Sequence, residues 1–144
     1  NIYQVSLNRL LAKSDIISIH LELNKSTKGI INKNVIDKMG YNKIFINVSR
    51  EELVENYDIL DYAIEKNIIS YAGLDISMVR KETIKSKLIK KWKTKKNNFD
   101  KKIIINPHVA FYSRDSFEVM RTRAAMTALH IIQKKQLNKY KVKL

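Results

Sequence analysis

Four ionisable side chains stand at the end of predicted β-strands or within three residues after them in this 144-residue chain: His20, Arg50, Asp75 and His108. An arginine keeps its positive charge at any pH that a protein experiences. An imidazole takes up and releases a proton near neutral pH. Loops that follow parallel strands converge on a crevice at one edge of the sheet. The sequence therefore predicts a site that combines a permanent cation, a carboxylate and imidazoles capable of proton transfer.

Strand and helix patterns alternate around these residues. The expected strands are short, apolar and rich in β-branched residues, and they comprise residues 16–20, 44–48, 68–74 and 103–105. The expected helices comprise residues 7–13 after the cap Ser6, a segment around 35–39 that starts at Asn32 or Asn34 and ends at Gly40, a segment that starts at Asn56, and residues 114–134. Strands that alternate with helices of about ten residues predict βα units and a parallel sheet.

The positive charge is concentrated in two segments. The whole chain has 28 basic and 14 acidic residues, a net charge of +14. Residues 80–102 hold eleven basic residues against Glu82 and Asp100, and residues 134–143 add five more without an acid, so the rest of the chain is neutral. One interpretation is a solvated lysine-rich surface, and the other is a surface that binds nucleic acid or an anionic membrane. Trp92 and Phe99 are the only aromatic residues among these lysines, and no nucleic-acid-binding motif is present. Nucleic acid and membrane are therefore not expected partners.

Composition excludes several other classes of protein. No apolar run approaches the roughly 20 residues of a membrane span, and the first residues show no signal-peptide pattern. The absence of cysteine excludes disulfides, thiolate metal sites and cysteine nucleophiles, and it is compatible with a cytoplasmic protein. No metal site is expected.

Five stretches of the chain form an ordered series of motifs. They are residues 5–7 (VSL) with 14–20 (SDIISIH), 27–32 (TKGIIN), 46–50 (INVSR) with 53–54 (LV), 71–75 (YAGLD) and 106–113 (NPHVAFYS). In this order and spacing they resemble the NAD-dependent D-2-hydroxyacid dehydrogenases, most closely the D-lactate dehydrogenase branch. Each stretch alone is weak evidence, whereas five in order are strong evidence. The resemblance covers most of this chain but less than half of a complete enzyme.

The resemblance implies an α/β fold, a partial Rossmann-like, doubly wound parallel sheet that is the later half of a dinucleotide-binding domain, followed by a long C-terminal helix. Residues 1–113 would form the incomplete NAD-binding domain, with the lysine-rich segment at 79–102 inside it. Residues 114–144 would form the C-terminal helix and basic tail, which would pack on a substrate domain absent from this sequence. The apolar stripe of the long helix also leads us to expect a homodimer of the full-length protein.

The resemblance further implies hydride transfer between NAD and a small D-2-hydroxy acid or 2-oxo acid. Arg50 would bind the substrate carboxylate with two hydrogen bonds, and His108 would be the general acid/base. The residues implied to contact NAD are Leu21, Glu22, Thr27, Val48, Ser49, Arg50 and Asp75. The alternative is a non-catalytic Rossmann remnant that binds nucleic acid or another anionic partner through its lysine-rich segments.

Three departures from the family pattern lead us to expect that this chain alone is inactive. No G-x-G-x-x-G sequence is present to approach the NAD pyrophosphate. Glu51 replaces the glycine that follows the arginine, and its charge would repel a substrate carboxylate. Arg80 occupies the position of the family's catalytic glutamate, where a cation would disfavour a protonated His108. Glu82 is the nearest carboxylate that could replace that glutamate.

Overall fold

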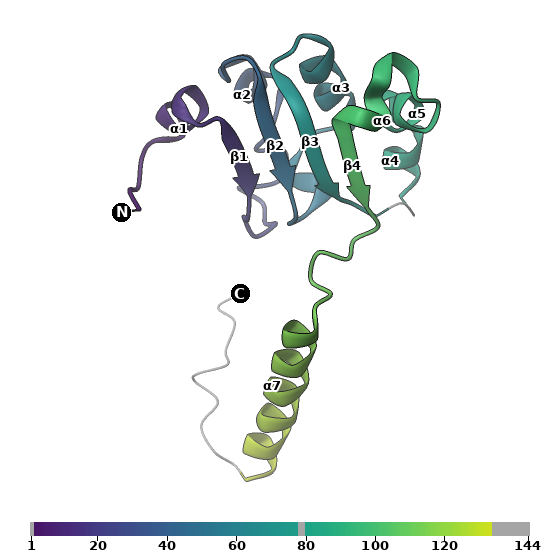
Figure 1. The fold of residues 1–144 in the computed structure, drawn as a ribbon. Coiled ribbons are helices and arrows are strands. Elements are labelled where there is room, and N and C mark those ends of the chain that lie inside the picture. The colour runs from purple at the N-terminus through teal and green to yellow at the C-terminus, as the bar shows by residue number, and fades with distance from the viewer. Residues whose placement is uncertain (1, 78–79, 134–144) are drawn as a thin grey trace. The chain divides into compact units, whose positions relative to one another are not determined.

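A four-stranded parallel sheet is the centre of the described part of the chain, which comprises residues 2–77 and 80–133 of the computed structural model (Figure 1). In spatial order the strands are β1 (Ile16–Ile19), β2 (Lys43–Asn47), β3 (Ile69–Asp75) and β4 (Ile103–Asn106). Asn47 is paired with Ile19 on one side and with Leu74 on the other. Asp75 is paired with Asn106. All four strands therefore end at the same edge, and the predicted α/β fold with a parallel sheet is confirmed.

Helices precede the sheet, connect its strands and follow it. They are α1 (Leu7–Lys13), α2 (Lys33–Asp37), α3 (Tyr57–Glu65), α4 (Lys81–Lys85), α5 (Lys87–Lys93), α6 (Phe99–Lys102) and α7 (Arg114–Ile132), with short 3₁₀ helices η1 (Glu51–Leu53) and η2 (Lys96–Asn98). The side chains of Ser6, Asn32 and Asn56 accept hydrogen bonds from backbone N–H groups in the first turns of α1, α2 and α3. The predicted caps are thus confirmed, because this capping geometry depends only on neighbouring residues.

The end of α2 was predicted wrongly. The helix ends at Asp37 and is capped by Lys38, so that Gly40 lies beyond it. A Cβ atom at Gly40 would lie 3.2 Å from Cε of Lys43. Lys43 is buried at the start of β2, with 6% of its surface exposed. Gly40 therefore makes room for this lysine side chain and does not terminate the helix.

One face of the sheet carries the hydrophobic core. Helix α3 packs between α2 and α5 on this face (Figure 1). The largest fully buried side chains there include Phe45, Leu60, Ile64, Ile69 and Ile89. On the other face, Ile16, Tyr71 and Ile104 are more than half exposed. Strand residues alternate between the two faces, so the sheet of this chain is covered on one side by its own helices.

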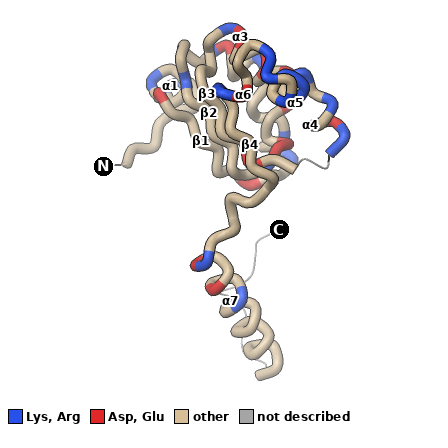
Figure 2. Tube along the Cα trace, turned by 45° about the vertical axis from the view of Figure 1, so that its right-hand side comes forward, with Lys and Arg blue, Asp and Glu red and all other residues tan. Residues whose placement is uncertain are grey.

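The lysine-rich segment folds as part of the sheet-containing unit, and the sequence patterns did not predict its helices or its buried apolar residues. Leu88 and Ile89 of α5 and Phe99 of α6 are fully or almost fully buried. The indole N–H of Trp92 donates a hydrogen bond to the carbonyl oxygen of Ile103, at 3.2 Å. Figure 2 shows lysine and arginine positions gathered along α4 and α5. The basic side chains thus surround a small set of apolar anchors.

The chain divides into two compact units, Asn1–Val109 and Ala110–Leu144. In the second unit, Ser113 caps α7, and the rings of Tyr112 and Phe117 lie edge to face with centroids 4.9 Å apart. The long helix was predicted for residues 114–134, and α7 covers Arg114–Ile132. Lys134 and the basic tail lie outside the described residues. Among the residues that the structure describes, no helix is long and apolar enough to cross a membrane.

Candidate functional site

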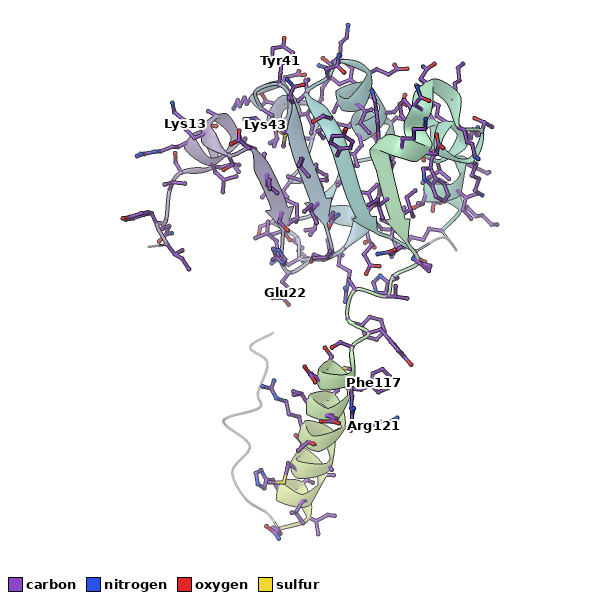
Figure 3. The ribbon with its side chains drawn as sticks, in the orientation of Figure 1. Lys13, Glu22, Tyr41, Lys43, Phe117 and Arg121 are labelled. Carbon is purple, nitrogen blue, oxygen red and sulfur yellow. The ribbon has the colours of Figure 1, made fainter. Side chains whose placement is uncertain are left out.

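The edge at which the four strands end carries all of the predicted site residues. His20 directly follows β1, Arg50 lies three residues beyond β2, Asp75 is the last residue of β3, and His108 lies two residues beyond β4. Glu22, which follows the end of β1, lies at this edge, whereas Tyr41 and Lys43 lie at the opposite edge (Figure 3). The parallel register therefore gathers the chemistry-bearing residues along one side of the sheet.

Two loops at this edge are tied together by hydroxyl groups. The Ser49 hydroxyl donates a hydrogen bond to the carbonyl oxygen of Leu21, at 2.5 Å, and so joins the loop after β2 to the loop after β1. The Thr27 hydroxyl donates to the carbonyl oxygen of Glu22, at 2.6 Å, which is a bond within the loop after β1. Leu21 and Val48 remain about two-fifths exposed beside these bonds. The structure therefore brings five of the predicted cofactor-binding residues into one connected surface.

The conformation of the Arg50 loop depends on Asn47, a residue to which the sequence patterns gave no role of its own. Asn47 has 1% of its surface exposed. Its amide nitrogen donates to the Arg50 carbonyl oxygen at 3.0 Å, and its amide oxygen accepts from the Ser49 backbone N–H at 3.1 Å. The buried amide thus shapes the turn, and the Arg50 guanidinium, which bonds the Ser49 carbonyl oxygen, lies on the exposed side. An asparagine at the end of a buried strand was the available signal.

Asp75 holds the loop that carries His108. Its carboxylate accepts a hydrogen bond from the Val109 backbone N–H, at 2.7 Å, although the two residues are 34 positions apart. Asp75 has 5% of its surface exposed. His108 has a φ of 56°, a backbone conformation that residues other than glycine rarely adopt. Its backbone N–H donates a hydrogen bond to the Asn106 carbonyl oxygen at 3.0 Å. The buried carboxylate therefore fixes the backbone next to a strained imidazole-bearing residue.

His20 is held locally. Its Nε2 atom lies 2.7 Å from the hydroxyl of Ser18, within hydrogen-bond distance. This contact is consistent with a structural role for His20 at the end of β1.

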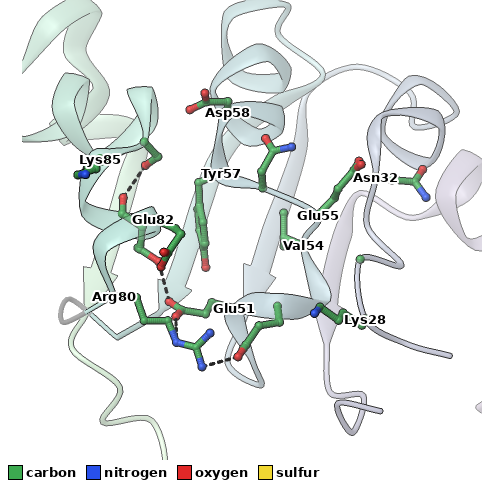
Figure 4. Close-up of a pocket in the computed structure, with 15 residues that line it drawn as sticks. Lys28, Asn32, Glu51, Val54, Glu55, Tyr57, Asp58, Arg80, Glu82 and Lys85 are labelled. Atoms are coloured by element: carbon green, nitrogen blue, oxygen red, sulfur yellow. Dashed lines mark hydrogen bonds and ion pairs between the residues drawn. The ribbon is translucent and has the colours of Figure 1, made fainter. Parts of the chain in front are cut away.

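Two of the departures from the expected pattern, Glu51 and Arg80, form an ion pair with each other (Figure 4). The Arg80 Nε atom lies 2.5 Å from the Glu51 carboxylate, and the same guanidinium also pairs with Glu52. The Thr83 hydroxyl donates to the other Glu51 oxygen at 3.1 Å. Burial raises the pKa of Glu51, while the Thr83 hydrogen bond and the Arg80 charge oppose this rise. The Glu51 charge is therefore matched inside the protein, and Glu82 lies nearby on α4.

Comparison with known proteins identifies the family. Residues 1–110 match the NAD-binding domain of the D-isomer-specific 2-hydroxyacid dehydrogenases. The chain belongs to this family.

Individual members show the extent of the similarity. The chain is 35% identical over 118 residues to hydroxypyruvate reductase of Blautia hydrogenotrophica, covering 81% of this chain and 33% of that protein. It is 31% identical over 118 residues to the D-specific alpha-keto acid dehydrogenase of Enterococcus faecium, covering 78% of this chain and 36% of that protein. The structure of D-lactate dehydrogenase with NAD⁺ from Lactobacillus jensenii has a TM-score of 0.76 and 27% identity, covering 97% of this chain and 43% of that one. The chain thus matches between about a fifth and about a third of the length of its curated relatives.

The residues of this family member fit one part of NAD and not another. The exposed side chains of Leu21 and Val48, next to the hydrogen-bonded loops, suit a planar ring that carries polar substituents. The pyrophosphate requires bare backbone at a helix N-terminus. The chain has only three glycines, Gly29, Gly40 and Gly73, and none forms the necessary cluster. The strand-end edge therefore fits the nicotinamide portion, and the phosphate-binding portion has no counterpart in these 144 residues.

Proposed function

We propose that this chain is the later half of the NAD-binding domain of an NAD-dependent D-2-hydroxyacid dehydrogenase that acts on a small 2-oxo or 2-hydroxy acid. The observation that supports this most directly is that the proposed site residues lie at one edge of the sheet, in a domain that matches this family. Arg50, Asp75 and His108 reach that edge from three adjacent strands. The names of the relatives, which include a hydroxypyruvate reductase and a D-lactate dehydrogenase, indicate small 2-oxo acids as the substrate class.

Arg50 and His108 would act on different groups of the substrate. The exposed guanidinium of Arg50 would hold the substrate carboxylate with two parallel hydrogen bonds, an arrangement that a lysine cannot provide. NADH, when bound, would supply the hydride that adds to C2 of the 2-oxo acid. The imidazolium of His108 would donate its proton to the carbonyl oxygen as the electron pair of the C=O bond moves onto it. In the oxidative direction, neutral His108 would remove that proton again.

Asp75 and the loop cluster would position these groups. Asp75 would keep the His108 loop in its strained conformation through the bond to Val109. Leu21, Glu22, Thr27, Val48 and Ser49 would line the nicotinamide side of the cofactor, where the Ser49–Leu21 bond keeps the two loops in contact. The complete protein would supply the glycine-rich unit and the substrate domain, and we propose that it is a homodimer.

A chimera tests this proposal, because the 144-residue chain lacks the phosphate-binding loop. The matched 118-residue segment of the Blautia hydrogenotrophica hydroxypyruvate reductase is replaced by the corresponding residues of this chain. We expect the chimera to oxidise NADH with a 2-oxo acid. His108→Ala should lower kcat by about 10²–10⁴-fold, the usual contribution of a general acid/base. Arg50→Ala should raise KM for the 2-oxo acid and lower kcat/KM.

His20→Ala is the matched control, because His20 lies at the same edge but is bonded to Ser18, and it should leave turnover nearly unchanged. Turnover that persists in His108→Ala or Arg50→Ala would contradict the assigned roles. The unmodified 144-residue chain should show little or no NADH oxidation, and robust oxidation by it would contradict the need for a separate phosphate-binding unit.

A further inference from the structure

A cavity of about 840 Å³ lies outside the strand-end cluster, against the segment that joins β2 to α3 (Figure 4). Its floor is formed by residues 51–58, one wall by the loop around Lys28 and Asn32, and the other wall by α4 with its flanking residues. This volume is that of a small-molecule site and is far larger than a single ion requires. The resemblance places Glu51, Arg80 and Glu82 next to the dehydrogenase site, and these residues also line the cavity. The proposed dehydrogenase chemistry gives no role to the cavity itself.

Hydrogen bonds hold both walls of the cavity to its floor. On one side, the Gly29 N–H donates to the Glu52 carbonyl oxygen at 2.8 Å, and residues Ile31 and Val54 form a parallel β-bridge. Gly29 has a φ of 66°, which favours glycine at this turn. On the other side, the Asp58 carboxylate accepts from the Lys87 N–H at 2.8 Å. The walls of the cavity are therefore held in place by the chain's own hydrogen bonds.

The cavity is acidic, although the protein as a whole is strongly basic. Five carboxylates and three cations line it, whereas the chain has a net charge of +14. At one end, the Arg80 guanidinium pairs with both Glu51 and Glu52, and Lys28 lies on the same side (Figure 4). Asp58 lies at the other end, and Glu82 and Lys85 belong to the wall formed by α4 (Figure 4). The lining as a whole therefore carries an excess of two negative charges.

Tyr57 provides a second, independent indication of a ligand. The residue has 6% of its surface exposed, and its hydroxyl oxygen has no hydrogen-bond partner among the described residues. Figure 4 shows its ring extending along the cavity with the hydroxyl end toward Glu51 and Arg80. Burial, and then the charges of Glu51 and Glu52, raise the pKa of Tyr57, so the hydroxyl remains neutral. A buried hydroxyl without a partner is costly, and few occur in native proteins.

We propose that this cavity binds a small aliphatic diamine, with one ammonium group at the Tyr57 and Glu51–Arg80–Glu52 end and the other at the Asp58 end. An ammonium N–H can donate to the Tyr57 oxygen, and its charge offsets the excess of carboxylate. Anionic ligands are disfavoured by the same excess. No group of three or more His, Asp or Glu side chains suited to a metal ion occurs in the described ranges, so an organic cation fits the cavity better than a metal ion.

Titration calorimetry on the whole 144-residue chain tests the proposal with 1,4-diaminobutane as the probe. Butane-1,4-diol and succinate are the matched neutral and anionic compounds of the same length. We expect saturable binding of one diamine per chain that weakens with added salt, and no saturable binding of the diol or of succinate. The absence of saturable diamine binding, or equal binding of the diol, would overturn the proposal.

Two conservative variants locate the site. Tyr57→Phe removes only the hydroxyl and should weaken diamine binding about fivefold, the effect of one net hydrogen bond. Asp58→Asn keeps an oxygen that can accept from Lys87 but removes the charge, and should also weaken binding. Tyr41→Phe, at the far edge of the sheet (Figure 3), is the control and should not change it. Unchanged binding in both cavity variants, each with a native circular dichroism spectrum, would place the diamine elsewhere and refute the inference. The result is independent of dehydrogenase activity, because the assay contains neither NADH nor a 2-oxo acid.

Discussion

The strand-end edge and the lysine-rich segment 80–102 use charged and polar residues in opposite ways. At the edge, polar groups such as Ser49 and Asp75 hold exposed loops through hydrogen bonds. In the lysine-rich segment, apolar anchors such as Ile89 and Phe99 are buried. The only lysine there that pairs with acids in the described residues is Lys91.

This difference shows why charge density is a poor guide to a site. The segment with the highest density of lysine is attached to the fold mainly through its few apolar residues. The edge, with little net charge, displays a guanidinium and an imidazole from loops whose backbones are fixed. Substitutions of buried residues in the lysine-rich segment should therefore lower stability strongly, and substitutions at the strand-end edge should lower it only slightly.

Phe99→Ala should give the largest loss of stability. Phe99 has 1% of its surface exposed, and removing a fully buried aromatic ring leaves a cavity that costs about 3–5 kcal/mol. Urea unfolding followed by circular dichroism measures the change. Phe111→Ala is the matched control, because half of that side chain is exposed, and it should alter stability by less than about 0.5 kcal/mol. Equal effects of the two substitutions would mean that the lysine-rich segment is not anchored as described.

Lys91→Met should destabilise the protein by about 2 kcal/mol. Its ammonium group pairs with Asp61 at 2.6 Å and with Glu65 at 2.6 Å. Asp61 has 5% of its surface exposed, so the substitution leaves a buried carboxylate without its cation. Lys90→Met, at the neighbouring exposed position, is the control and should change stability by less than about 0.5 kcal/mol.

The effect of Lys91→Met should depend on pH. The hydrogen bond and charge of Lys91 lower the pKa of Glu65 from its usual 4.5. Burial alone would lower the pKa of Lys91, but the hydrogen bonds and charges of Asp61 and Glu65 outweigh it and raise that pKa above 10.5. The stabilisation by this ion pair is therefore complete between pH 4.5 and pH 10.5, the ordinary pKa values of the two groups. It is lost as the pH falls through the lowered pKa of Glu65. A difference between wild type and Lys91→Met that persists undiminished at pH 2 would contradict the ion-pair explanation.

The sequence predicted those features that depend on neighbouring residues. The caps at Ser6 and Asn56 and the strands around them follow local rules of hydrogen bonding and periodicity. By contrast, the ion pair between Glu51 and Arg80 joins residues 29 positions apart, and each was interpreted separately as a disturbance. Helix α5 escaped prediction because lysines interrupt its short apolar face.

The candidate site shows the same division between local and tertiary information. Its residue types and their common edge followed from the order of strands and from the family resemblance. The interactions that support them did not, because nothing local identifies the partner of a buried carboxylate such as Asp75. A residue's type indicated its chemistry, whereas the contacts that orient it required the folded chain.

Ser49→Ala should give the smallest loss of stability and so test the other side of the comparison. The substitution removes one hydrogen bond between two exposed loops, which is worth about 1 kcal/mol or less. Its effect on the opening of the two loops should be greater than this energy suggests, because the bond joins the loops that carry Leu21 and Val48. Amide hydrogen exchange should therefore quicken in residues 20–27 and 48–50 and stay unchanged in α5. Faster exchange throughout the sheet would show instead that the edge is as strongly coupled to the core as the lysine-rich segment is.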